Sequence, residues 1–111
     1  MIEGVGLNRP TANFISAQID DAFKVSDIEA LHMAHYLLEN EGLFVGGSSA
    51  MNLAAVVKQA RKRKGQNIVT VICDSGVRSM RKFWNQEYLD GKNVGFRPRS
   101  KYYPNDLSFV G

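Results

Sequence analysis

Polar residues able to do chemistry follow one apolar run in the middle of the chain. The tripeptide Asp74–Gly76, Asp-Ser-Gly, comes directly after Ile68–Cys73, which is almost entirely apolar and β-branched. Such a run predicts a strand buried on both faces. In open α/β sheets, ligands bind at the carboxyl ends of strands, so the carboxylate and hydroxyl here are candidates for chemistry. The same position suits Asp74 or Ser75 as a helix N-cap, and the two roles are compatible.

Two glycine-containing turns could also approach a ligand closely. Gly4 and Gly6 bracket Val5, where glycines permit tight turns, although this short pattern favours a flexible loop. Gly46–Ser49, Gly-Gly-Ser-Ser, could present amides and hydroxyls to an anion at the start of a helix. It is not a Walker loop, because the lysine required after the glycines is absent.

Two histidines and one cysteine are the candidate metal ligands. His32 and His35 are three residues apart and could meet on one helical face. No third ligand lies near them in the sequence, which favours ordinary helix positions, and no metal site is predicted. The single cysteine, Cys73, cannot form an internal disulfide and favours a reducing setting inside the cell, in the cytoplasm or in mitochondria.

Two helices are predicted before the apolar run. Ser26–Glu29 has the form of a capping box, apolar residues then recur at helical spacing, and Gly42 suits a C-cap. The second helix is apolar over Ala50–Val57 apart from one asparagine, and cationic over Lys58–Lys64. This pattern predicts a helix whose first half is buried and whose basic end is solvated, where cations suit the helix dipole.

The end of the chain carries a weaker pattern. Val77–Trp84 is amphipathic and predicts a further helix, and beyond Asn85 the periodicity fades. Residues 87–111 are therefore predicted to form an extended tail whose aromatic side chains lie on a surface.

Composition sets the class of protein. The chain has 111 residues, 44% of them hydrophobic, which suits one modest domain. No apolar run is long enough to span a membrane, so no membrane partner is expected. The net charge of +3 and the basic run Arg61–Lys64 raise the possibility of nucleic-acid binding. No aromatic residues are interleaved with these cations, which favours a solvated helix end.

Three segments in this order resemble a known family. They are Ile2–Gly6 (Ile-Glu-Gly-Val-Gly), Glu41–Asn52 and Ile68–Gly76. Together they resemble the C-terminal part of cysteine synthase and its cystathionine β-synthase relatives, which are fold-type II pyridoxal-phosphate enzymes. The resemblance covers roughly Ile2 to Asn85. Ala50-Met51 stands where the family commonly has Gly-Ala, and Val77–Met80 leaves the subfamily open.

The resemblance implies a cofactor and site residues. Ser75 would hydrogen-bond the pyridine nitrogen of pyridoxal 5'-phosphate, and Gly4 and Gly6 would line the active-site cleft. A hydroxyl is a neutral partner, so the cofactor would be a tempered electron sink suited to losing a β-leaving group. The implied reaction is a β-replacement in cysteine biosynthesis, the work of a transferase or lyase that forms L-cysteine from O-acetylserine and sulfide.

Other family motifs are absent from this sequence. The Schiff-base lysine, the asparagine loop for the substrate carboxylate and the glycine-threonine-rich phosphate loop do not occur in it. No catalytic residue is therefore assigned, and neither catalysis nor cofactor binding is expected from this chain alone. The chain is expected to need the missing N-terminal part, or a homo-oligomer partner, to bind an amino-acid substrate.

The expected fold is α/β, a partial three-layer tryptophan-synthase-β-like fold. One buried parallel strand would be flanked by helices in an incomplete sheet, with residues 1–86 as the C-terminal portion of the catalytic domain and residues 87–111 as the tail. Two other functions stay open. One is a non-catalytic truncated relative that serves as a binding or assembly module, and the less favoured one is a basic nucleic-acid binder.

Overall fold

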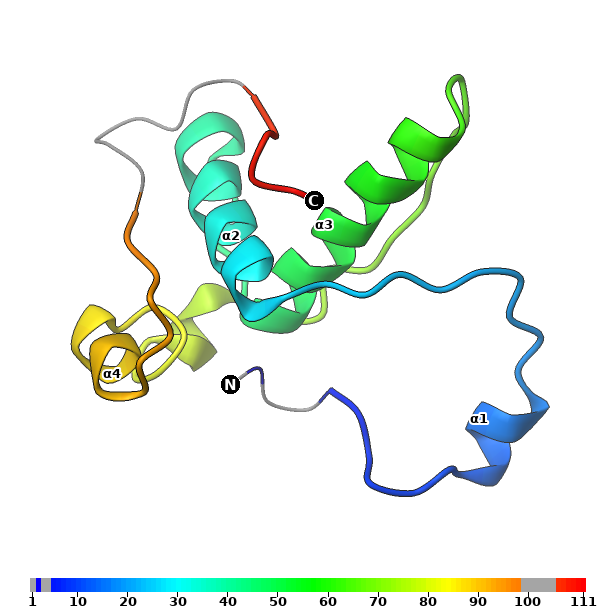
Figure 1. Ribbon diagram of the computed structural model, residues 1–111, viewed down its shortest axis with the longest axis horizontal. Helices are drawn as coiled ribbons and strands as arrows, with labels where there is room; N and C mark the ends of the chain where they lie inside the picture. The colour runs from blue at the N-terminus through cyan, green and yellow to red at the C-terminus, as the bar shows by residue number, and fades with distance from the viewer. Residues whose placement is uncertain (1, 3–4, 99–105) are drawn as a thin grey trace.

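Two packed helices form the centre of the molecule. The computed structural model describes residues 2, 5–98 and 106–111. Its elements in chain order are α1 (Ala12–Ser16), α2 (Asp27–Glu41), α3 (Gly47–Lys62), the 3-10 helix η1 (Gly76–Ser79) and α4 (Gln86–Gly91). α2 packs across α3, α1 lies at the tip of an arm away from both, and α4 lies on the opposite side (Figure 1).

The capping signals predicted for the first helix are confirmed. The Ser26 hydroxyl accepts from the Glu29 N–H at 3.2 Å, and the Glu29 carboxylate accepts from the Ser26 N–H at 2.8 Å. Gly42 ends α2 in the left-handed region, with φ of 68°. Glycine adopts this conformation without a steric cost, so the sequence itself specifies where this helix stops.

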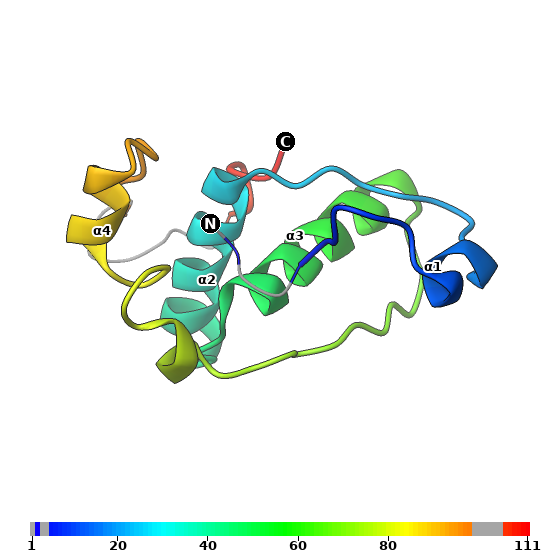
Figure 2. The same ribbon diagram turned by 90° about the horizontal axis from the view of Figure 1, so that it is seen from below.

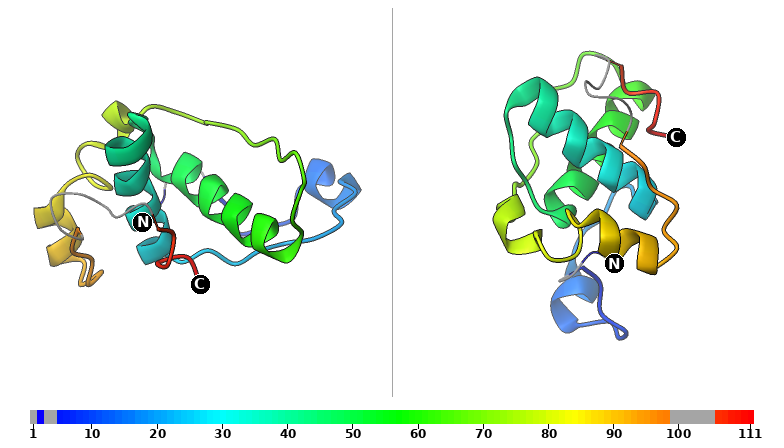
Figure 3. Two further views of the ribbon diagram at one scale, coloured as in Figure 1. Left: turned by 90° about the horizontal axis from the view of Figure 1, so that it is seen from above. Right: turned by 90° about the vertical axis from the view of Figure 1, so that its left-hand side faces the viewer.

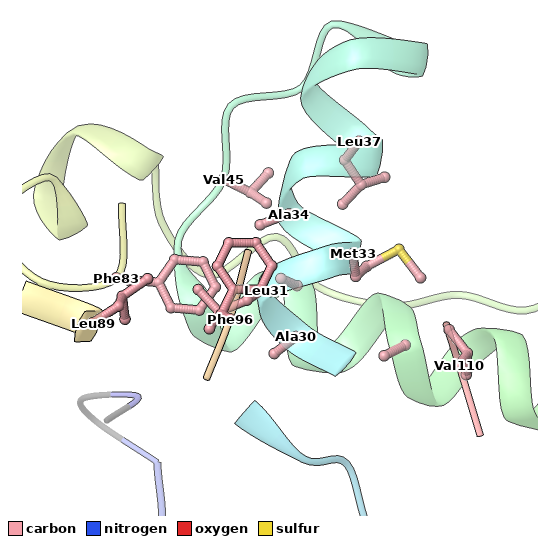
Figure 4. Close-up of a cluster of buried hydrophobic side chains, with 12 residues drawn as sticks. Ala30, Leu31, Met33, Ala34, Leu37, Val45, Phe83, Leu89, Phe96 and Val110 are labelled. Carbon is pink, nitrogen blue, oxygen red and sulfur yellow. The ribbon is translucent and has the colours of Figure 1, made fainter. Parts of the chain in front are cut away.

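Four small side chains of α2 and α3, which pack against each other, are completely buried. Ala30 and Ala34 of α2 and Ala50 and Ala54 of α3 are all 0% exposed. Each pair is spaced i, i+4 and so lies on one face of its helix. The remaining core side chains surround this contact (Figure 4). The buried apolar set is Ala30, Leu31, Met33, Ala34, Leu37, Val45, Ala50, Ala54, Phe83, Leu89, Phe96 and Val110.

The strand predicted over Ile68–Cys73 is not formed in the described part of the chain, and the burial expected for it is wrong. The segment runs drawn out alongside α3 without helix or strand (Figures 2 and 3). Val69 is 95% exposed and Val71 is 64% exposed. A strand must pair its backbone groups with a neighbour. The described residues offer only one isolated antiparallel bridge, between Val45 and Ser75, so the expected parallel sheet has no partner strands here.

The C-terminal quarter differs from its prediction. The predicted helix over Val77–Trp84 is reduced to the single turn of η1, followed by irregular turns. The stretch predicted as an extended tail instead contains α4 and supplies Leu89, Phe96 and Val110 to the core. Its periodicity is weak because short segments, rather than a continuous helix face, deliver these side chains. No helix of the described residues has the length and apolarity needed to cross a membrane.

One carboxylate ties four parts of the fold together. Glu29 accepts from Lys58 of α3 at 2.8 Å and from the Gly111 N–H at 2.8 Å, besides capping α2. Lys58 also donates to the Lys24 carbonyl at 2.6 Å. Burial alone would raise the pKa of Glu29. The hydrogen bonds from Lys58, the Ser26 and Gly111 N–H groups and the Ser26 hydroxyl outweigh that effect and lower the pKa from 4.5 to about 2.

This depressed pKa predicts acid sensitivity. The stabilisation from Glu29 is complete above pH 4.5, the ordinary pKa, and is lost as the pH falls through about 2. Glu29→Gln should lower the free energy of unfolding at neutral pH by about 1–3 kcal/mol and flatten its pH dependence in that acid range. Denaturant titrations at several pH values measure both effects. Glu41→Gln, at the exposed end of α2, should leave both unchanged. An equal loss in the two variants would contradict the role of Glu29.

Candidate functional site

The candidate site lies where residues 73–76 pass the N-terminal end of α3. Ser49, in the first turn of that helix, is 0% exposed. Its hydroxyl oxygen accepts from the Cys73 N–H at 2.8 Å and lies 3.4 Å from both N and O of Asp74. A buried hydroxyl therefore fixes the end of the apolar run against α3. Ser49 was considered above only as part of a turn that could bind an anion. Its anchoring role could not be found from local spacing, because its partners are 24 and 25 residues away along the chain.

Backbone hydrogen bonds hold the same stretch against the segment that leads into α3. The Gly46 N–H donates to the Asp74 carbonyl and the Gly76 N–H donates to the Phe44 carbonyl, each at 3.1 Å. These bonds flank the Val45–Ser75 bridge. Three consecutive residues on each side are thus held together, and the backbone that carries Ser75 is fixed.

Ser75 sits on the exposed side of this junction. It is the N-cap of η1, and its hydroxyl accepts from the Val77 N–H at 3.3 Å. The prediction of a cap at Asp74 or Ser75 is therefore confirmed for Ser75. Among the described residues, the Ser75 hydroxyl proton has no acceptor. The side chain is exposed, so its O–H can donate to a ligand while its oxygen caps the turn.

Close packing explains the glycines at this junction. A Cβ on Gly76 would lie 2.4 Å from the Phe44 ring, and a Cβ on Gly46 would lie 2.1 Å from Asp74 Oδ1. The Phe44 ring packs edge-on against Trp84 at 4.8 Å between centroids, and the Trp84 indole N–H donates to the Val45 carbonyl at 2.9 Å. Glycine is needed at both positions because the neighbouring groups fill the space.

The carboxylate of Asp74 packs against Gly46. Its Oδ1 is buried against Gly46 and has no hydrogen-bond partner in the described part of the chain. A buried unpaired carboxylate oxygen is costly, so this atom is the least satisfied polar group of the junction.

A polar hollow of about 530 Å³ opens beside the junction. Cys73 and Asp74 line it, together with Ser48 from the first turn of α3 and the cations of the segment Arg78–Lys82. Ser75 is not among its lining residues. The hollow therefore does not show where a group bound to Ser75 would lie.

Of the three predicted site residues, the structure describes Ser75 and Gly6. Gly4 lies outside the described residues. Gly6 adopts a φ of 76° and lines a separate, mostly apolar hollow of about 710 Å³ with Phe14. Gly6 and Ser75 line no common cavity in the described part of the chain.

The histidines are packed among aromatic rings. His32 lies edge-on to Phe96 at 4.8 Å between ring centroids, and His35 lies 4.7 Å from Trp84. Burial lowers the pKa of His35, and the Glu39 carboxylate opposes this only in part, so the neutral imidazole is favoured. The described residues contain no cluster of three His, Cys, Asp or Glu side chains placed to hold a metal ion.

Part of the basic end of α3 is engaged within the molecule. Arg61 donates to the carbonyls of Val110 at 2.5 Å and Leu107 at 2.7 Å. Lys62 forms an ion pair with Asp21. The pKa of Asp21 is lowered, chiefly because its carboxylate accepts a hydrogen bond from Lys62. These cations hold other segments onto α3, which weakens the case for a nucleic-acid surface.

Comparisons with known proteins agree on one family. A family model described as "Pyridoxal-phosphate dependent enzyme" matches residues 1–74. The chain is 44% identical to cysteine synthase 2 of Schizosaccharomyces pombe, over 99% of this chain and 27% of that protein. It is 48% identical to cysteine synthase of Dictyostelium discoideum, over 82% of this chain and 24% of that protein. It is 34% identical to cystathionine beta-synthase of Mus musculus, over 79% of this chain and 16% of that protein. The chain thus spans about a quarter of the length of the cysteine synthases.

The buried hydroxyl of Ser49 gives a test of the junction. Ser49→Ala leaves the Cys73 N–H without its acceptor, so the free energy of unfolding should fall by about 1–2 kcal/mol. Amide hydrogen exchange at residues 73–76 should accelerate more than exchange in α2. Ser48→Ala is the matched control, because that neighbouring side chain is half-buried and its hydroxyl forms no described hydrogen bond. Unchanged protection at residues 73–76 in Ser49→Ala would show that the junction is held without Ser49.

Proposed function

The chain belongs to the family of pyridoxal-phosphate-dependent enzymes, and we propose that it forms the part of a cysteine synthase-like enzyme that meets the pyridine ring of the cofactor. The proposal rests above all on Ser75, whose exposed O–H has no described acceptor and stands on a backbone fixed from both sides. The identity of 44–48% to two cysteine synthases supports the same assignment. The complete enzyme would form L-cysteine from O-acetylserine and sulfide.

A hydroxyl at this position fits the ring nitrogen. Ser75 can donate its proton to that nitrogen while its oxygen continues to accept from the Val77 N–H. A neutral donor does not hold a proton on the ring nitrogen as a carboxylate would. With Ser75 as its partner, the pyridine ring would therefore be a weaker electron sink than a protonated ring. When bound, pyridoxal phosphate supplies the electron sink for β-replacement. The fixed turn would keep the ring in one orientation at little cost in entropy.

The remaining contacts would come from outside this sequence. Neither the Schiff-base lysine motif nor the phosphate loop occurs in the 111 residues, so the chain fits only the ring-nitrogen contact. We propose that residues 1–86 form the C-terminal portion of the catalytic domain. The segment after them would complete the same core through Leu89, Phe96 and Val110. In the complete enzyme, working in the cytoplasm or in mitochondria, Ile68–Cys73 would become an interior strand of the α/β fold.

A second function, a non-catalytic assembly module, is favoured by one observation. Val69, Val71 and Ile72 are 95%, 64% and 50% exposed in a segment without charge. Apolar surface of this kind marks a place where another chain segment docks. This module would keep the fold of the junction and require no cofactor.

Reconstitution of the enzyme from two parts tests the cofactor role. This chain and the remaining part of S. pombe cysteine synthase 2 are purified separately and mixed with pyridoxal phosphate, O-acetylserine and sulfide. Cysteine should form in the mixture and in neither part alone. Ser75→Ala should lower the rate roughly tenfold to hundredfold, because one ring contact is lost. The absorbance spectrum of the bound cofactor should also shift.

Two controls separate this effect from general damage. Ser16→Ala removes a hydroxyl from α1 and should leave the rate unchanged, whereas Ser75→Thr keeps the donor and should retain most of the activity. An inactive wild-type mixture, or an unchanged rate and spectrum in Ser75→Ala, would overturn the assignment and favour the assembly module.

A further inference from the structure

The chain that follows Ser75 returns to the residue with which Ser75 pairs. Ser75 forms an isolated antiparallel bridge with Val45. At the other end of the loop 75–84, the Trp84 indole N–H donates to the carbonyl of the same Val45 at 2.9 Å. Both ends of this loop are therefore held by one residue.

The bridge leaves the Val45 carbonyl available to the indole. Its two hydrogen bonds join the residues on either side of Val45 to those on either side of Ser75. In an antiparallel pair of this kind, the N–H and C=O groups of the central residues point away from each other. Within the described part of the chain, no backbone N–H donates to the Val45 carbonyl. The indole of Trp84 thus supplies this hydrogen bond and holds Val45 on the edge opposite Ser75.

The ring of Trp84 packs on the same region. The Phe44 ring lies edge-on to it at 4.8 Å between centroids, and the His35 ring of α2 lies at 4.7 Å. The Phe44 ring in turn fills the space beside Gly76, where a Cβ would lie 2.4 Å from it. The indole therefore restrains both sides of the bridge, one directly and the other through a single ring.

The backbone of Trp84 holds the turn that Ser75 caps. The Trp84 N–H donates to the carbonyl of Ser79, the last residue of η1, at 3.2 Å. Ser75 caps the start of η1, where its hydroxyl oxygen accepts from the Val77 N–H at 3.3 Å. The orientation of that oxygen depends on the placement of η1, and Trp84 fixes the end of η1.

We infer that Trp84 is a positioning residue for Ser75: its indole N–H holds the loop 75–84 closed on Val45 and so sets the direction in which the Ser75 hydroxyl donates. The inference rests on the proposed function, in which this hydroxyl meets the ring nitrogen of the cofactor, and it names the residue that orients the contact. A loosened loop would let the hydroxyl take several directions, of which only one suits the ring.

Hydrogen exchange in the unchanged chain tests the closed loop without any substitution. Trp84 is the only tryptophan of the sequence, so its indole proton gives a single NMR signal. This proton and the Gly76 N–H should be protected from exchange to a similar degree, because the loop and the bridge open together. A freely exchanging indole proton beside a protected Gly76 N–H would overturn the inference.

Trp84→Phe removes the donor and keeps an aromatic ring. In the chain alone, exchange at the Gly46 and Gly76 N–H groups should accelerate about twofold to tenfold, the change that one neutral hydrogen bond is worth. In the two-part mixture with pyridoxal phosphate, O-acetylserine and sulfide, cysteine formation should slow by a similar factor. The absorbance of the bound cofactor should shift in the same direction as in Ser75→Ala.

Tyr88→Phe is the matched control. It also removes a polar atom from a half-buried aromatic side chain and keeps the ring, but it leaves the bond from Trp84 to Val45 intact. Exchange at the bridge, the rate and the cofactor spectrum should all be unchanged in this variant. Circular dichroism should show the same helix content in both variants, so that a lower rate in Trp84→Phe is not a loss of fold.

A double variant separates positioning from general damage. Because Trp84 acts through Ser75, Trp84→Phe should cause no further loss of rate in a Ser75→Ala background. A contribution to the fold alone would instead multiply the two losses. Multiplied losses, or an unchanged rate and exchange in Trp84→Phe, would overturn the inference.

The same variants distinguish this inference from the proposed function. A rate lowered by Ser75→Ala and unaffected by Trp84→Phe would retain the cofactor contact and remove Trp84 from it. An unchanged rate in Ser75→Ala would overturn both, because no contact would remain to be oriented.

Discussion

The close contact between α2 and α3 is the constraint on which the rest of the structure depends. Ala30 and Ala34 of α2 and Ala50 and Ala54 of α3 are all fully buried in one core. A larger residue at any of the four would have to displace packed neighbours, which destabilises a core by about 1–3 kcal/mol. The carboxylate of Glu29 links α2 to α3 through its ion pair with Lys58. It also accepts a hydrogen bond from the Gly111 N–H at the end of the chain.

The candidate site inherits its geometry from this contact. Ser49 precedes Ala50 in the first turn of α3, and both residues are fully buried. The Ser49 hydroxyl accepts hydrogen bonds from the N–H groups of Cys73 and Asp74. Two hydrogen bonds between backbone groups then fix the residues on either side of Ser75. The side chain that could contact a ligand is exposed, and the groups that position it are buried. This division suits a rigid contact point better than a mobile loop.

The apolar surface beside the junction has a different origin. The segment Ile68–Cys73 has the composition of an interior strand, but α3 satisfies only one of its edges, and mainly through Asn52 and Ser49. The chain spans about a quarter of the length of the cysteine synthases it matches. The described residues offer this segment no partner strand, so its backbone groups and valines lie on the surface.

The sequence by itself determined the local features. The capping box at Ser26, the stop at Gly42, the presence of two helices and a cap at Asp74 or Ser75 follow from interactions within four residues, so they could be predicted from residue types. The ordered motifs also identified the family, which the comparisons confirm. Residues brought together from far apart in the chain could not be found this way. The anchoring role of Ser49, the packing of Phe44 on Trp84 and the burial of Phe96 and Val110 depend on the crossing of α2 and α3. Only the tertiary structure decided the fate of Ile68–Cys73, because burial of a strand is a property of its neighbours and not of its own side chains.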